Sequence, residues 1–103
     1  WTVFFDRVDV LLCPTTPTPA NLHMQKQPFN ERAIMASGAS RAYADNLVSP
    51  GVTTLCGLPS TAVSLGRDST GLPIGMHVLG PAYGDKTTSP VMNLLENAGY
   101  VFK

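Results

Sequence analysis

The sequence has little charge of either sign. Only 14% of its 103 residues are charged, compared with about 25% in an average soluble protein. Seven basic and seven acidic residues leave a formal net charge of zero, so we expect no nucleic-acid partner and no binding to an anionic membrane. A free-standing domain of this size has a large surface to cover with charge, and this sequence has few charges to cover it.

Long apolar runs and metal-ligand spacings are also missing. No run approaches the roughly 20 residues that cross a bilayer, and the first residues lack the basic and apolar segments of a signal peptide. We therefore expect a soluble, cytoplasmic protein. Cys13 and Cys56 stand in apolar contexts without metal-ligand spacing, which predicts two buried, unpaired thiols and no metal site.

The first third of the sequence indicates an α/β fold. An amphipathic helix that already includes the first residue is predicted by the helical spacing of Trp1, Phe4, Phe5 and Val8. We therefore expect the chain to be a piece of a longer protein. The apolar run 10–13 predicts a strand buried on both faces, and the prolines of residues 14–20 predict a stiff loop leaving that strand. Residues 21–30 are polar and predict a surface segment.

The remaining two thirds predict helices around a hairpin. Between residues 41 and 55 we expect two short helices separated by a break at Pro50 and Gly51. Two strand-like runs joined by a polar linker predict an antiparallel hairpin at about 61–79. A closing helix is predicted at about 87–98, with Pro90 in its first turn and Gly99 after its end.

No complete catalytic arrangement can be read from the residues alone. His23 is expected to be a solvated loop histidine, and His77 a structural histidine with satisfied hydrogen bonds or one that lines a cleft. Only Asp6 and Asp9 lie close together among the acids, so no glycosidase dyad is indicated. Residues 37–40 (SGAS) predict a surface turn, because no strand leads into them and no lysine follows at a phosphate-loop spacing.

Three segments resemble the amidase signature family. Residues 4–20 (FFDRVDVLLCPTTPTPA) resemble its FF..YDVLL.PT.PTPA run, and residues 55–60 (LCGLPS) and 71–80 (GLPIGMHVLG) resemble its LAGLPA and GLPVGLQLIG segments in the same order. Ser64 and His77 depart from the proline and glutamine common there. The resemblance implies that residues 1–103 are the C-terminal part of one amidase signature domain, an α/β fold whose mixed sheet is flanked by helices.

The same resemblance implies hydrolysis of an amide without a metal or organic cofactor. Members of the family use a serine nucleophile, a second serine joined by a cis peptide and a lysine, all upstream of the region matched here. The N-terminal catalytic core would then be absent and this piece alone inactive. Its serines and lysines do not match the family's catalytic motif, so none is assigned a catalytic role; they include Ser37, Ser40, Lys26 and Lys86.

Substrate binding is what this portion could supply. The resemblance implies part of the core and one wall of the acyl pocket. Pro14, Thr15 and Thr16 leave the end of a buried strand, where ligands usually meet an open α/β sheet, with a rigid structural loop as the alternative. Asp45 lies close to where some members place an acidic substrate contact, with an acid on a helix surface as the alternative.

Two further interpretations stay open. The chain could belong to the amidase subunit of a tRNA-dependent amidotransferase, which releases ammonia from glutamine, although residues 41–57 and 80–85 look more like stand-alone amidases. It could also be a non-catalytic structural or interaction module that kept the fold. The expected partners are a small amide in the longer protein, the missing N-terminal portion and, as an open alternative, a second copy in a homodimer. Alone, we expect exposed sheet edges and an exposed apolar helix face to cause aggregation.

Overall fold

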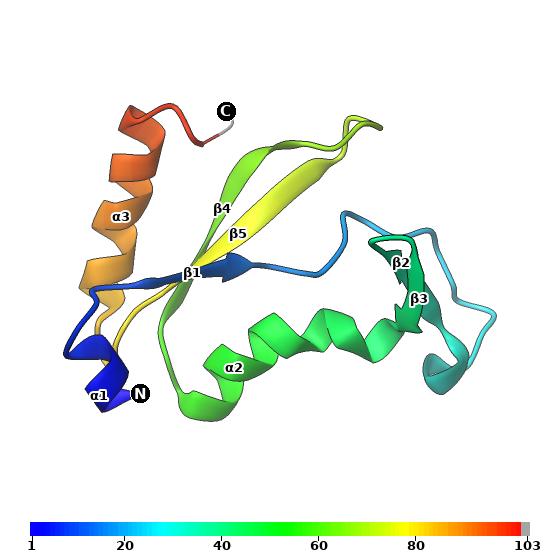
Figure 1. Cartoon of the computed structure of the whole chain (residues 1–103), viewed down its shortest axis with the longest axis horizontal. Coiled ribbons are helices and arrows are strands. Elements are labelled where there is room, and N and C mark those ends of the chain that lie inside the picture. The colour runs from blue at the N-terminus through cyan, green and yellow to red at the C-terminus, as the bar shows by residue number, and fades with distance from the viewer. Residues whose placement is uncertain (102–103) are drawn as a thin grey trace.

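The computed structural model describes residues 1–101 and shows helices on both sides of a small sheet (Figure 1). It contains both strands and α-helices, together with two short 3-10 helices, η1 and η2. The predicted α/β class is confirmed. In chain order the elements are α1 (Thr2–Phe5), β1 (Leu11–Pro14), η1 (Phe29–Glu31), β2 (Ala33–Ala36), β3 (Ala39–Ala42), η2 (Tyr43–Leu47), α2 (Val48–Cys56), β4 (Ser60–Arg67), β5 (Pro73–Leu79) and α3 (Asp85–Asn97).

The main sheet has three strands in the order β1-β5-β4, and both of its strand pairs are antiparallel. The hairpin predicted at about 61–79 is confirmed as β4 and β5. A register shift between Ser64 and Gly66 places a bulge in β4. Cys13, His77 and Ala62 lie opposite one another across the three strands, so their side chains share one face of the sheet.

The hairpin loop is organised by the carboxylate of Asp68. Its Oδ1 accepts hydrogen bonds from the Thr70 backbone N–H at 2.8 Å, the Thr70 hydroxyl at 2.7 Å and the Leu72 N–H at 2.9 Å. These donors, the Thr70 hydroxyl first, lower the pKa of Asp68 below its ordinary 3.8. The aspartate therefore fixes the turn through its charged form.

Acid should loosen this loop. Because the folded-state pKa is lowered, the Asp68 contribution is complete above the ordinary pKa and is lost as the pH falls through the lowered value. We expect the amide resonances of Thr70 and Leu72 to titrate together as the pH falls below the ordinary aspartate pKa of 3.8. In Asp68→Asn, which keeps an acceptor oxygen but no titrating group, that titration should vanish; its persistence would mean that another carboxyl controls the loop.

Helix α3 covers one face of β4 and β5. The Thr61 hydroxyl of β4 donates to the hydroxyl of the buried Thr88 at 2.9 Å, and Val63 and Val78 are buried on the same face. The predicted closing helix is confirmed, but it begins at Asp85, so Pro90 is inside the helix rather than in its first turn. That part of the prediction is wrong, because Gly84 is the N-cap and the helix therefore starts before residue 87.

Two predictions for the N-terminal segment are corrected. The first helix ends at Phe5 and does not continue through Val8. Strand β1 is not buried on both faces, since the side chain of Leu12 is 46% exposed. The reason is its place at the edge of the sheet, where β5 is its only partner among the described residues. Helix α3 packs over β4 and β5 instead.

A second, two-stranded sheet is formed by β2 and β3. Ser37 and Gly38 make the turn between them with positive φ values of 52° and 79°, a conformation that glycine adopts freely. The predicted surface turn is confirmed, but the inference that no strand leads into it is wrong. Both strands are short and only Ile34 is buried in them, so their sequence shows no clear alternation.

Helix α2 continues through the expected break. Pro50 is the third residue of α2, in the first turn, where a backbone N–H has no partner inside the helix and proline is tolerated. The prediction of a break at Pro50 and Gly51 is therefore wrong, and the change from η2 to α2 comes at Val48 instead. Gly57 ends the helix with a left-handed φ of 62°.

The core is small, and the two cysteines are free within residues 1–101. Cys56 is exposed, so the prediction of two buried thiols is wrong for it, while Cys13 is half-buried. None of the helices described here is long and apolar enough to cross a membrane. Among residues 1–101, the buried hydrophobic side chains are Ile34, Leu58, Val63, Val78 and Leu79.

Candidate functional site

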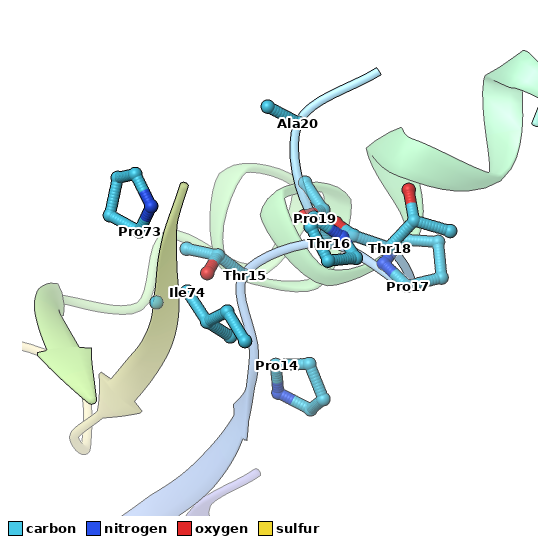
Figure 2. Close-up of a pocket in the computed structure, with 10 residues that line it drawn as sticks. Pro14, Thr15, Thr16, Pro17, Thr18, Pro19, Ala20, Pro73 and Ile74 are labelled. Carbon is cyan, nitrogen blue, oxygen red and sulfur yellow. Dashed lines mark hydrogen bonds between the residues drawn. The ribbon is translucent and has the colours of Figure 1, made fainter. Parts of the chain in front are cut away.

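The loop that follows β1 borders a cleft of about 350 Å³. The Thr15 N–H donates to the Gly75 carbonyl at 3.4 Å, which carries the β1–β5 pairing one residue past the strand. A Cβ at Gly75 would lie 2.8 Å from Thr15 Oγ1, so glycine lets the loop approach the sheet closely. Figure 2 shows Thr15 beside Ile74, with the proline-rich segment arching away from the sheet and Pro73 on the far side of β5.

Hydrogen bonds inside the loop hold its shape. The Thr16 hydroxyl donates to the Thr18 carbonyl at 2.7 Å, and the Thr18 hydroxyl donates to Asn21 Oδ1 at 3.1 Å. Three prolines further restrict the backbone of residues 14–20. The loop is thus preorganised, which suits a pocket wall and also the alternative of a rigid structural loop.

A second cleft of about 410 Å³ also borders the loop. Pro14 and Pro17 border both clefts. Asp45 lines the second one, and its Oδ2 is 2.7 Å from Arg41 Nε in an ion pair. The fold therefore brings all four sequence-predicted residues to one region, with Thr15 and Thr16 on the first cleft, Asp45 on the second and Pro14 between them. The other residues of the second cleft are Ala36, Ser37, Val48 and Ser49.

Sequence reasoning missed Arg41, Ser49 and Gly75 as residues of this region. Arg41 could have been found from its position four residues before Asp45, a spacing at which opposite charges often pair. Gly75 lies in residues 71–80, which resemble a segment of the family, but its close approach to Thr15 becomes visible only in three dimensions. Ser49 carried no sequence signal, and it matters because its side chain hydrogen-bonds the Cys13 thiol.

The face of the sheet behind the loop holds a thiol and an imidazole. Burial raises the pKa of the Cys13 thiol above 9.0, and the hydrogen bond with Ser49 only partly offsets this. Cys13 is therefore a neutral thiol near neutral pH rather than a nucleophile. His77 Nδ1 is buried without a hydrogen-bond partner in residues 1–101, which corrects the expectation of a satisfied histidine. His23, by contrast, is exposed as predicted.

The two clefts can bind and orient a ligand. Their linings combine prolines, hydroxyls and one neutralised charge pair, which suits an uncharged or zwitterionic small molecule. They hold no histidine, cysteine or lysine that could act as a base beside a serine or threonine. Nor does any group of three histidine, cysteine or acidic side chains in the described part of the chain come close enough to hold a metal ion.

Comparison with known proteins agrees with the resemblance seen in the sequence. Residues 1–88 match the family model described as Amidase. The chain belongs to the amidase family. This match includes the whole proline-rich loop, both strands of the main hairpin and all four predicted site residues. The resemblance of residues 4–20, 55–60 and 71–80 to the amidase signature family is thereby confirmed.

Three curated relatives of this amidase-family chain share one name and are each the A subunit of glutamyl-tRNA(Gln) amidotransferase. The protein from Thermosynechococcus vestitus is 37% identical over 83 residues, which are 81% of this chain and 15% of the relative. A Prochlorococcus marinus protein is 33% identical over 99 residues, 96% of this chain and 18% of the relative. A protein from Acaryochloris marina is 38% identical over 76 residues, which are 74% of this chain and 14% of the relative. The chain thus spans about one sixth of the length of these relatives.

Proposed function

We propose that this chain forms one wall of the substrate cleft of an amide hydrolase whose catalytic residues lie outside residues 1–103. One observation carries the proposal: the family match covers the loop 14–20 and the residues of the two clefts beside it. Since these clefts lack a nucleophile with its base, their part is to bind and orient. In this proposal residues 1–103 are the C-terminal part of a single amidase signature domain, and no cofactor takes part.

The proposed reaction breaks a carbon–nitrogen bond by serine attack. A serine hydroxyl is a weak nucleophile at neutral pH, so a second serine and a lysine would relay its proton to the leaving nitrogen. The resulting acyl-enzyme ester would then be cleaved by water, with backbone N–H groups stabilising the oxyanion. A wall held rigid by Pro14 and the Thr16 hydrogen bond limits the motion of the bound acyl group, which favours the reactive geometry.

The amide of glutamine is the second and narrower candidate substrate. The names of the relatives favour it over the stand-alone amidases suggested by residues 41–57 and 80–85. In that case the longer protein would release ammonia from glutamine as the amidase subunit of a multi-chain amidotransferase in the cytoplasm. Arg41 and Asp45 could then exchange their mutual pairing for the charged groups of the amino acid.

A chimera tests the proposal. This chain would replace the matched segment of the Prochlorococcus marinus relative, which aligns with 96% of it. Thr15→Val keeps the branched shape beside Gly75 but removes the hydroxyl, and Asp45→Asn removes the charge. We expect each to lower kcat/KM about tenfold, the effect of one lost hydrogen bond of about 1.4 kcal/mol. Ser69→Ala, on the exposed hairpin loop, is the control and should leave kcat/KM unchanged.

The choice of amide separates the candidate functions. Hydrolysis of glutamine alone supports the amidotransferase component, whereas hydrolysis of simple aliphatic amides supports a stand-alone amidase. A folded chimera that hydrolyses neither would argue for the non-catalytic module. If the chimera is active and both site variants match the wild type, residues 14–20 are a structural loop and the assignment of Thr15 and Asp45 is wrong.

A further inference from the structure

Helix α2 has the composition of a buried helix but lies at the surface. Its nine residues, Val48–Cys56, include no charged side chain, and none of them is buried. Leu47, Val48 and Leu55 are 58%, 64% and 87% exposed. A helix without a charged face is normally enclosed by protein, because a surface helix carries polar residues on its outer side. The surface of α2 therefore lacks, in this chain, the covering protein that a helix of this composition normally has.

The size of the exposed surface supports the same conclusion. The chain exposes 7257 Å², whereas a compact protein of 11.0 kDa exposes about 5,600 Å². Its radius of gyration is 15.4 Å, against about 13 Å for a compact chain of this length. The excess, about 1,600 Å², is roughly twice what one partner contributes to a standard protein interface. Burying this excess area requires a large and permanent protein–protein contact.

Helix α2 connects the candidate site with the N-terminal aromatic residues. At its beginning, Val48 and Ser49 line the second cleft. At its end, the Sγ of the exposed Cys56 accepts a hydrogen bond from Trp1 Nε1 at 2.9 Å. Figure 1 shows α2 running below the sheet, from beside the β2–β3 hairpin to the side where α1 lies. Protein packed on α2 would thus also border the cleft that contains Asp45.

We propose that the surface of α2, together with Leu47, is the docking surface for the part of an amidase-family protein that this chain lacks. The relatives continue for about five times the length of the matched segment, which supplies a partner large enough to cover the excess area. A second copy fits less well: a two-fold contact covers one patch, whereas exposed apolar residues occur on several elements, among them Val3, Leu12, Leu55 and Leu94. The proposal rests on family membership, and not on the proposed reaction.

A binding experiment tests this surface. The Prochlorococcus marinus relative without its matched segment would be co-expressed with this chain, and the affinity between the two pieces would be measured. Leu55→Lys and Val48→Lys, both at exposed positions, place a charge on α2, and we expect each to weaken binding at least tenfold, about 1.4 kcal/mol. Leu22→Lys is the matched control, because Leu22 is 89% exposed in a loop far from α2 in sequence. Circular dichroism checks that the variant chains keep their fold.

Alkylation of Cys56 provides a second readout. In the free chain the exposed Cys56 should react much faster than the half-buried Cys13, and the partner piece should slow the reaction of Cys56 at least tenfold. Wild-type pieces that do not associate would overturn the proposal, as would equal weakening by all three lysine variants. Self-association of the chain that is lost in Leu55→Lys would identify a second copy as the occupant instead. Tight binding without amide hydrolysis would count against the proposed function alone.

Discussion

Replacing Leu79 by alanine should abolish the cooperative unfolding transition of this chain. The side chain of Leu79 is fully buried, and it lies opposite Leu11 of β1 and Ser60 of β4. Removing a buried leucine side chain costs about 2–5 kcal/mol through lost transfer energy and the cavity left behind. A core with so few buried side chains leaves a free energy of unfolding at or below about 5 kcal/mol. The loss therefore equals most of the total.

Urea unfolding followed by circular dichroism measures this effect. Leu94→Ala is the matched control, because it makes the same chemical change on α3 at a position that is 66% exposed. We expect its free energy of unfolding to change by less than about 0.5 kcal/mol. Equal effects of the two substitutions would show that the apolar core does not lie where β1 and β4 meet β5.

Gly80→Ala should destabilise the chain by about 1–3 kcal/mol through overpacking. A Cβ at position 80 would lie 2.8 Å from Thr88 Cγ2 and 3.3 Å from the Gly84 carbonyl oxygen. Thr88 cannot easily move away, since it is 2% exposed and its hydroxyl bonds Thr61 and the Asp85 carbonyl. The backbone of Gly80 does not have a positive φ, so the penalty is steric rather than conformational.

A second substitution distinguishes this steric mechanism from others. Thr88→Ser removes the methyl group that the new Cβ would meet but keeps the bonded hydroxyl, so the double variant should regain part of the lost stability. Gly51→Ala provides the opposite control: its Cβ would meet open space inside α2, and alanine should stabilise that helix by about 0.5–1 kcal/mol. Additive losses in the double variant, measured by urea unfolding, would contradict the proposed contact.

The stiff loop beside the candidate site could be predicted from the sequence because its signals are local, while the substrate-binding role of its residues stays a prediction. The prolines after an apolar run predicted a stiff loop, and Pro14, Thr15 and Thr16 do line a cleft there. The sequence predicted this loop at the end of a buried strand of an open α/β sheet, whereas β1 pairs antiparallel with β5 and its Leu12 is exposed. The pairing of Arg41 with Asp45 is local, since the two residues are four positions apart. That Asp45 shares a cleft with Pro14 and Pro17 depends on how residues 33–49 fold back toward β1, and no short sequence window contains that contact.

The sequence by itself determined the family, the main hairpin, the closing helix and the stiff loop. Each depends on neighbouring residues: alternation in strands, caps and apolar spacing in a helix, and the fixed φ of proline. Only the tertiary structure decided that β1 is an edge strand with an exposed Leu12, that Pro50 lies within a continuous helix, and that Gly75 and Gly80 receive the side chains of Thr15 and Thr88. Those features depend on which distant segments pack together. The type of an apolar or small residue does not by itself show whether another segment packs against it.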